Sequence, residues 1–254
     1  MCRHGEGHIY EYVETAIERG FDEIGFAEHI PIPGLHDPDG RMLIEEFPIY
    51  LQEIRDAQKK YSGITIRLGI EADFIPRYLD FVAKFLSEYP FDFVIGSVHF
   101  IDDWDFSHPD FIEKYHTFGI DETYKAYYNL LAEAASTGLF DVIGHFDQPK
   151  KFGHQPTTDL SVEIEKALSI IHKKNLVLDV NTAGKRKPVG EIYPSEDILR
   201  RAHELGISVI LGSDAHRPED VGSHFSEARE LLLKVGYKRQ CAFRNRERML
   251  FPIE

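Results

Sequence analysis

The chain has 254 residues, of which 43% are hydrophobic and 28% charged, and its formal net charge is −14. A chain of this size buries roughly 70–75% of its unfolded surface, which is enough for one large core. The acidic balance argues against a nucleic-acid binder, because such proteins carry basic faces. No run of about 18 apolar residues suits a membrane span. The N-terminal residues lack a signal-peptide core, and the only cysteines are Cys2 and Cys241, so we expect a reducing, cytoplasmic setting.

Apolar runs that suit buried strands alternate with amphipathic helical patterns along the chain. Helices are expected over residues 8–19, 43–60, 76–88, 121–136, 159–174, 195–205 and 223–235. Strands are expected over 22–29, 64–73, 91–100, 140–147, 176–182 and 207–214, with a short final strand within 241–251 and an irregular loop over 100–120. This alternation predicts βαβ units and a parallel sheet. Without repeats or linkers, a single domain over 1–254 is expected.

Each predicted strand ends in a polar side chain that can bind a metal or a ligand. In chain order these are His29, Glu71, His99, His145, Asn181, and Asp214 with His216. Barrels take their catalytic residues from the carboxyl ends of several strands, whereas open sheets place ligands at one switch point. Six successive endings of this kind therefore predict a barrel.

The first predicted element is a helix with only seven residues before it. In a βα barrel that helix follows a parallel strand. Six strands and seven helices thus predict a distorted (β/α)7 TIM-like barrel whose first strand is missing from this sequence.

Histidine, aspartate and glutamate together, without thiolates, suit Zn²⁺, Mn²⁺ or Fe²⁺. Glu71 has two oxygens with which to bridge two ions, and Asp214 and His216 alternate along the chain, so they share a face. Taken singly, each residue has a plainer explanation as a structural histidine, a turn-forming aspartate or a salt-bridging glutamate. The joint pattern favours metal binding. Cys2 is a weaker ligand candidate, since its thiol lies near the end of the chain, and chain ends readily fray.

The ordered motifs CRHGEG, GFAEH, GIEADF, GSVHF, GHFD and GSDAH resemble the PHP (polymerase and histidinol phosphatase) superfamily. More narrowly, the stretches GSVHFIDDWDFSHPDFIEKY, GHFDQPKKFG and NTAGKRKP resemble PHP-type histidinol-phosphate phosphatases. The resemblance covers essentially the whole chain. It implies a distorted seven-stranded barrel with two or three divalent ions at its carboxyl rim.

Carried over by position, the resemblance implies the ligands His4, His29, Glu71, His99, His145, Asp214 and His216. His4, His29 and His216 would serve one ion, with Asp214 near it. Glu71, His99 and His145 would serve another. The family's first strand, with its His-x-His pair, is absent here, which agrees with the strand count, and we expect a truncated sequence of a normal enzyme.

The resemblance further implies hydrolysis of L-histidinol phosphate to L-histidinol and phosphate, a step of histidine biosynthesis. A hydroxide held by the ions would attack phosphorus, with Asp214 and His216 as the catalytic residues. Arg186, Lys150 and Arg217 are the candidate phosphate donors, each with a solvated surface cation as the plainer alternative. Trp104, flanked by acidic residues at 102, 103 and 105, would supply an aromatic face to the cationic end of the substrate, with a charged, disordered loop as the plainer alternative.

Two alternatives stay open. One is another PHP phosphoesterase that acts on nucleotides, cyclic phosphates or general phosphate monoesters. The other is a non-catalytic metal-binding barrel, disabled by the missing strand. A metal-dependent amidohydrolase fits the strand ends but not the order of the motifs. The identity of the metal, the proton donor and the oligomeric state are not predicted.

Overall fold

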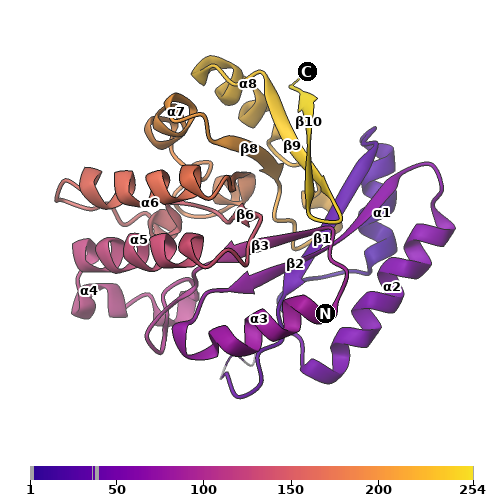
Figure 1. The fold of residues 1–254 in the computed structure, drawn as a ribbon, viewed down its shortest axis with the longest axis horizontal. Coiled ribbons are helices and arrows are strands. Elements are labelled where there is room, and N and C mark those ends of the chain that lie inside the picture. The colour runs from indigo at the N-terminus through magenta and orange to yellow at the C-terminus, as the bar shows by residue number, and fades with distance from the viewer. Residues whose placement is uncertain (1–2, 36, 38–39, 254) are drawn as a thin grey trace.

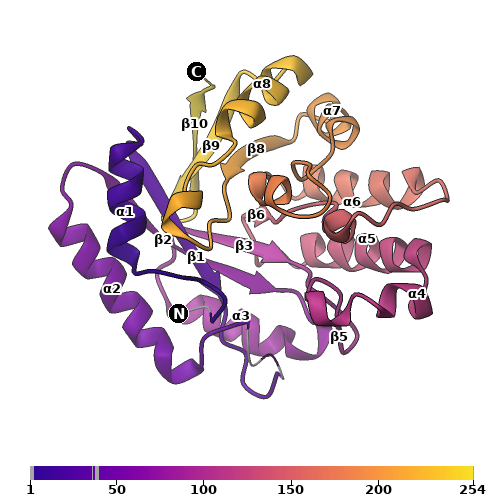
Figure 2. The ribbon, with the colours of Figure 1, turned by 180° about the vertical axis from the view of Figure 1, so that it is seen from behind.

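The computed structural model describes residues 3–35, 37 and 40–253, so Cys2 lies outside the described residues. Its centre is a six-stranded parallel sheet whose strands lie side by side in chain order, which confirms the predicted barrel-like α/β fold (Figure 1). The strands are β1 (Glu23–His29), β2 (Thr65–Asp73), β3 (Phe93–Ser97), β6 (Val142–Ile143), β7 (Val177–Asn181) and β8 (Ser208–Gly212). Figure 2 shows the same curled sheet from behind.

Helices cover the outer face of the sheet (Figures 1 and 2). They are α1 (Ile9–Glu18), α2 (Phe47–Lys60), α3 (Leu79–Glu88), α4 (Lys114–Phe118), α5 (Ile120–Ser136), α6 (Ser161–Lys173), α7 (Glu196–Glu204) and α8 (Phe225–Val235). Their apolar faces form the main core against the strands, where Tyr50 and Tyr127 are fully buried. Both phenols are satisfied by backbone carbonyls, as buried hydroxyls must be. Tyr127 donates to the carbonyl of His145 at 3.0 Å and so braces the end of β6.

A second, smaller apolar cluster fills the inner face of the sheet. Phe93, Val142 and Val177 from the sheet pack there against Cys241 and Phe243 of β9 (Arg239–Arg244). The prediction of one short final strand is therefore wrong, because β9 pairs antiparallel with β10 (Glu247–Pro252). Residues 245 and 246 both have positive φ, which is the backbone of the tight turns that join hairpin strands.

The prediction of an irregular loop over 100–120 is also wrong. This segment forms a small hairpin of β4 (Phe100–Ile101) and β5 (Trp104–Asp105), followed by α4. Asp102, with a φ of 53°, makes the turn. The segment is ordered because Phe100, Trp104, Phe106 and Tyr115 are buried in the core, whereas Phe111 and Phe118 are exposed.

The sheet is curled but does not close. In the part of the chain that the structure describes, β1 pairs only with β2, and β8 pairs only with β7. A cavity of about 700 Å³ lies between these two edges, lined by β1, β8 and β9. The sheet is therefore a half-barrel, open at the place where a closed ring would have another strand.

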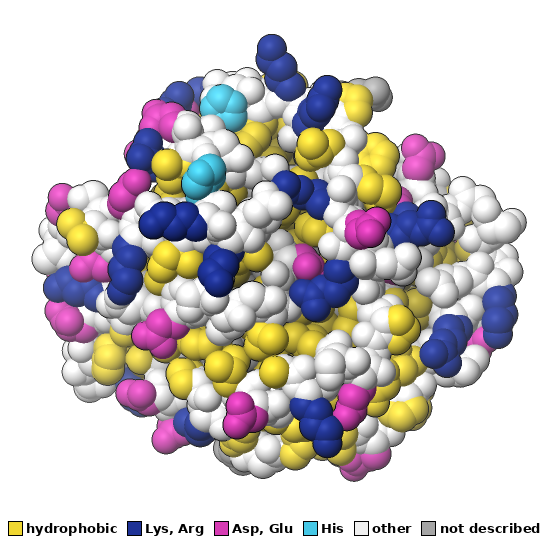
Figure 3. Space-filling view, viewed as in Figure 1, with side chains coloured by type: hydrophobic (Ala, Val, Ile, Leu, Met, Phe, Trp, Pro, Cys, Tyr) yellow, Lys and Arg dark blue, Asp and Glu magenta, His cyan; other side chains and the backbone are white. Residues whose placement is uncertain are grey.

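Charged side chains of both signs are mixed over the face in Figure 3, in spite of the net charge of −14. Among the described helices, none combines the length and the apolar character that crossing a membrane requires.

Candidate metal centre

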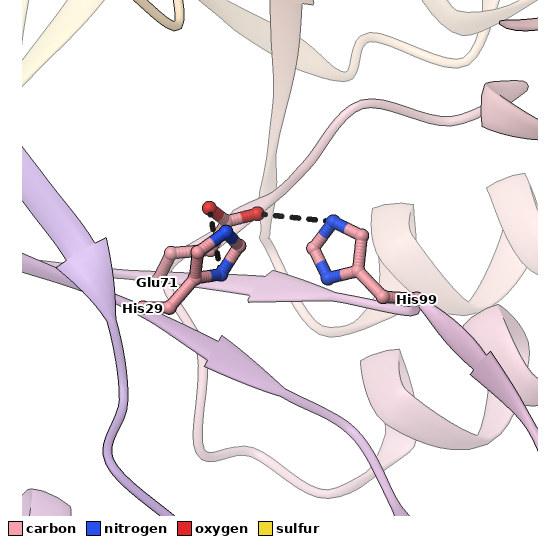
Figure 4. A group of neighbouring side chains, drawn as sticks. All are labelled: His29, Glu71 and His99. Carbon is pink, nitrogen blue, oxygen red and sulfur yellow. Dashed lines mark ion pairs between the residues drawn. The ribbon is translucent and has the colours of Figure 1, made fainter. Parts of the chain in front are cut away.

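Three neighbouring strands bring His29, Glu71 and His99 together at their carboxyl ends (Figure 4). In the parallel register of β1 and β2, His29 lies directly opposite Glu71. The Nδ1 atom of His29 is 3.4 Å from one carboxylate oxygen of Glu71, and Nε2 of His99 is 3.7 Å from the other. One ligand atom from each residue lies within 4.8 Å of the other two, so a single cation can touch all three.

Further histidines extend this trio into an arc. His145 follows β6, and its Nε2 atom lies 3.1 Å from Glu71 Oε1. On the other side, the ring centroid of His4 lies 5.5 Å from that of His29 and 4.5 Å from that of His216. Asp214 joins the arc through its carboxylate, which is 3.6 Å from Nδ1 of His216. All seven sequence-predicted ligands thus lie at one rim, and their binding of metal stays a prediction.

Two of these side chains sit on unusual backbone. His145 and Asp214 have φ angles of 40° and 46°, in the left-handed region that costs a residue other than glycine about 1–3 kcal/mol. The Asp214 turn is supported by Arg186, whose Nη2 donates to the carbonyls of Ser213 at 2.6 Å and Asp214 at 3.0 Å. Such strained positions cluster at functional sites, where surrounding contacts hold them.

The electrostatics of the centre are dominated by burial and by the shared carboxylate. Burial alone would raise the pKa of Glu71, but His29, His99 and His145 hold that pKa well below its ordinary value. Burial lowers the pKa of His29 to about 4, against the opposing effect of Glu71. Burial would also lower the pKa of His99, but the Asp73 carboxylate raises it to about 9.

Sequence reasoning missed Asp73, which is fully buried at the end of β2. Its Oδ1 atom lies 2.7 Å from Nδ1 of His99, and its Oδ2 atom accepts a hydrogen bond from Arg41 at 3.0 Å. Metal-binding histidines commonly donate their second ring N–H to a carboxylate in this way. The alternation of Glu71 and Asp73 along β2 was the available signal, because alternate residues of a strand share a face.

Asp179 of β7 was missed as well. Its carboxylate accepts a hydrogen bond from the amide of Asn181 at 2.9 Å, and the same amide group donates to Asp214 at 3.3 Å. Asn181 thus links a buried acid to a predicted ligand. Burial raises the pKa of Asp179 to about 7. The search for polar residues at strand ends had found Asn181 but not the Asp179 carboxylate that orients it.

The donor set fits a divalent cation. It consists of imidazole nitrogens and carboxylate oxygens, the donors that borderline ions such as Zn²⁺ accept. The Nδ1 atom of His145 is buried and has no hydrogen-bond partner among the described residues. A buried polar atom without a partner needs a ligand to satisfy it. The centre is therefore a His/Glu site suited to metal.

The predicted phosphate donors lie in three different environments. Arg186 is near the rim, and its Nη1 atom is buried without a partner among the described residues. Lys150 is buried rather than solvated, and its ammonium lies 2.9 Å from Asp147 and 3.0 Å from Glu191. Arg217 is 55% exposed at its side chain and pairs with Glu6 at 2.8 Å. Of the three, Arg186 alone keeps an unused buried donor.

Trp104 is 3% exposed and packs within the hairpin segment. Its ring meets Tyr115 edge-on at 5.0 Å, and the ammonium of Lys114 lies 5.4 Å from the ring centroid. Of the neighbouring acids, Asp103 is exposed and pairs with Arg77 at 2.6 Å. The contact of Trp104 with substrate stays a prediction, and in this structure the ring serves the packing of the segment.

Comparison with known proteins matches residues 1–183 to the PHP domain and residues 196–230 to the PHP-associated family. A probable histidinol-phosphatase of Deinococcus radiodurans is 42% identical over 97% of this chain and 94% of its own length. The histidinol-phosphatase of Bacillus subtilis is 34% identical over 87% of this chain and 92% of its own length.

Among solved structures, histidinol phosphate phosphatase from Lactococcus lactis, complexed with zinc, L-histidinol and phosphate, has a TM-score of 0.82 at 24% identity. The match covers 96% of this chain and 94% of the other, and it shows the same fold. A protein from Listeria monocytogenes that is named a putative histidinol phosphatase matches with a TM-score of 0.76 and 28% identity, over 89% of this chain and 96% of the other. With the domain match and the relatives of high identity, the chain belongs to the PHP family, in its histidinol-phosphatase branch.

Proposed function

We propose that this protein hydrolyses the phosphate monoester of L-histidinol phosphate. The observation that carries the proposal is the arc of histidines gathered around Glu71 at the carboxyl rim of the sheet. The resemblance to histidinol-phosphatases over nearly the whole chain supplies the substrate. The Lactococcus protein of the same fold is complexed with L-histidinol and phosphate, which supports both halves of the reaction.

The rim offers ligands for two or three ions, and we favour zinc or manganese. Glu71 is suited to bridging, because one of its oxygens faces His29 while the other faces His99 and His145. His4, His216 and Asp214 complete the other side. Divalent ions at such a site lower the pKa of bound water and polarise phosphoryl oxygens.

Arg186 is our choice for the residue that binds the phosphoryl group. Its Nη2 and Nε atoms are committed to the Asp214 turn and to Asp220, and its Nη1 atom is left to donate to a substrate oxygen. A guanidinium suits this role, because its planar fork fixes both the turn and the phosphate in one geometry. Lys150 can take part only by giving up carboxylate partners, which makes it the weaker choice.

The test is phosphate release by the purified protein loaded with Mn²⁺ or Zn²⁺. We expect L-histidinol phosphate to be hydrolysed far faster than nucleoside monophosphates at equal concentration. Arg186→Ala should raise KM for the substrate more than Arg217→Ala does, because Arg217 is exposed and already pairs with Glu6. A preference for nucleotides would overturn the substrate assignment.

A further inference from the structure

One buried side chain outside the predicted ligand set contacts the residues that directly follow His29 and His99, and the last residue of β2, the strand that carries Glu71. Arg41 lies between β1 and α2, and only 6% of its surface is exposed. We propose that Arg41 is a positioning residue: its guanidinium holds the carboxyl ends of β1 and β2 against the segment that follows β3, in the arrangement that presents these three ligands. The inference rests on the metal centre of the proposed function.

Arg41 makes one contact within two residues of each of the three ligands. Its Nη1 atom donates at 3.3 Å to the carbonyl of Ile30, which directly follows the histidine of β1. The same nitrogen donates at 3.0 Å to Asp73, the last residue of β2. The guanidinium carbon lies 5.7 Å from the ring centroid of Phe100, which directly follows the histidine after β3. A shift of this guanidinium would therefore displace residues close in sequence to every member of the trio.

The contact with Asp73 passes on to His99. One oxygen of Asp73 accepts a hydrogen bond from Arg41, and the other oxygen lies 2.7 Å from Nδ1 of His99. When Nδ1 carries the proton and donates it to Asp73, Nε2 is left free on the side of Glu71, as metal binding requires. Arg41 is held in turn by Asp37, which accepts from its Nε atom at 2.7 Å.

The chemistry of the cluster requires an arginine. Asp73 is fully buried, and a buried carboxylate without a charged partner is strongly destabilising. Lysine at position 41 would supply the charge but only a point donor, whereas the guanidinium reaches several acceptors with fixed angles. Arg41→Lys therefore separates the clamp from simple charge compensation.

The test measures Zn²⁺ affinity of the whole chain by competition with a chromophoric chelator, without substrate. We expect Arg41→Lys and Asp73→Asn each to weaken zinc binding by about 10- to 100-fold, the range found when partners of metal-binding histidines are removed. The matched control is Arg67→Lys. Arg67 pairs with Glu23 at 2.8 Å and also joins β1 to β2, but at their amino-terminal ends. The Arg67→Lys variant should leave zinc affinity unchanged.

Urea unfolding of the metal-free variants checks that each one folds, and Arg41→Lys is chosen because it keeps the charge. In the double variant with Asp73→Asn, the loss of zinc affinity should be smaller than the sum of the two single losses, since Arg41 acts in part through Asp73. The clamp is overturned by wild-type zinc affinity in Arg41→Lys, by an equal loss in Arg67→Lys, or by additive losses in the double variant. If the wild-type protein binds zinc but does not hydrolyse L-histidinol phosphate, the proposed function is refuted and the inference about Arg41 is unaffected.

Discussion

Glu71 stays charged in a buried position because the histidines around it stabilise its carboxylate. Desolvation opposes that charge, and the neighbouring imidazoles of His29, His99 and His145 more than offset it. The same arrangement prepares the site for cations, because the carboxylate is present before any ion arrives. At the scale of single residues, the centre therefore depends on one acid and on the rings that face it.

Glu71→Gln should remove most of the bound metal and lower kcat by more than about 100-fold, since it neutralises the only carboxylate among the three ligands His29, Glu71 and His99. Metal content after gel filtration and phosphate release measure the two effects. Glu23→Gln is the control, because Glu23 lies at the opposite end of β1 and pairs with Arg67. Retention of full metal content by Glu71→Gln would show that Glu71 is not a ligand.

The stability of the metal-free protein should fall between pH 6.5 and about 9. The pKa of His99 is raised from 6.5 to about 9 in the folded state, so the fold binds this proton more tightly than the unfolded chain does. That contribution is complete below pH 6.5 and is lost as the pH rises through 9. His29, with a pKa near 4, titrates below this window.

Urea unfolding across this pH range, in the presence of a chelator, measures the effect. Asp73→Asn removes the carboxylate that raises the pKa of His99, so its stability should change less with pH than that of the wild type. If the free energy of unfolding changes equally with pH in the two proteins, the pairing of His99 with Asp73 is contradicted.

At the scale of elements, close packing between strands depends on glycine at particular positions. A Cβ atom on Gly69 of β2 would overlap the ring of Phe93, which belongs to the inner apolar cluster. Gly69→Ala should therefore destabilise the protein by about 1–3 kcal/mol, as overpacking does. Gly63→Ala is the control, because a Cβ there meets nothing within 4 Å. Urea unfolding gives both values, and equal stability of the two variants would argue against tight packing at Gly69.

The hairpin segment tests whether Trp104 serves substrate or packing. Trp104→Phe keeps an aromatic ring but loses the indole N–H, which donates to the carbonyl of Phe111 at 3.3 Å. We expect a loss of about 1 kcal/mol in stability, the usual value of one hydrogen bond, and an unchanged KM. A raised KM with unchanged stability would instead place the ring against the substrate.

The elements that sequence reasoning predicted well are those with a long periodic pattern. The helices of 10–17 residues and the strands at 23–29 and 65–73 lie within a few residues of their expected bounds. The pairs β4–β5 and β9–β10 were missed because strands of two residues have no period, and because charged residues dominate the final hairpin. The strand-end rule located the rim, yet it could not show that Asp73 and Arg41 stand behind the ligands, since those contacts join distant parts of the chain.

At the scale of the whole molecule, the open edges of β1 and β8 set the pattern of local stability. Backbone groups of β2, β3, β6 and β7 have strands on both sides, whereas β1 and β8 have a partner strand on one side in the described chain. We expect amide hydrogens of β2, β3 and β7 to exchange more slowly than those of β1 and β8, as measured by hydrogen–deuterium exchange. Equal protection across the sheet would mean that the edges are covered in solution. The single-domain organisation over 1–254 stays a prediction.

The cavity between β1 and β8 also reaches His29, Glu71 and Asp214 from the flank, in addition to their position at the rim. Ions bound by these residues would be reached by solvent through this cavity, which would affect the rate of metal exchange rather than the affinity. Bound metal should be stripped by chelators and replaced from the medium within the time of an ordinary purification. The metal that the isolated protein carries would then reflect the supply in the growth medium as much as the preference of the ligands.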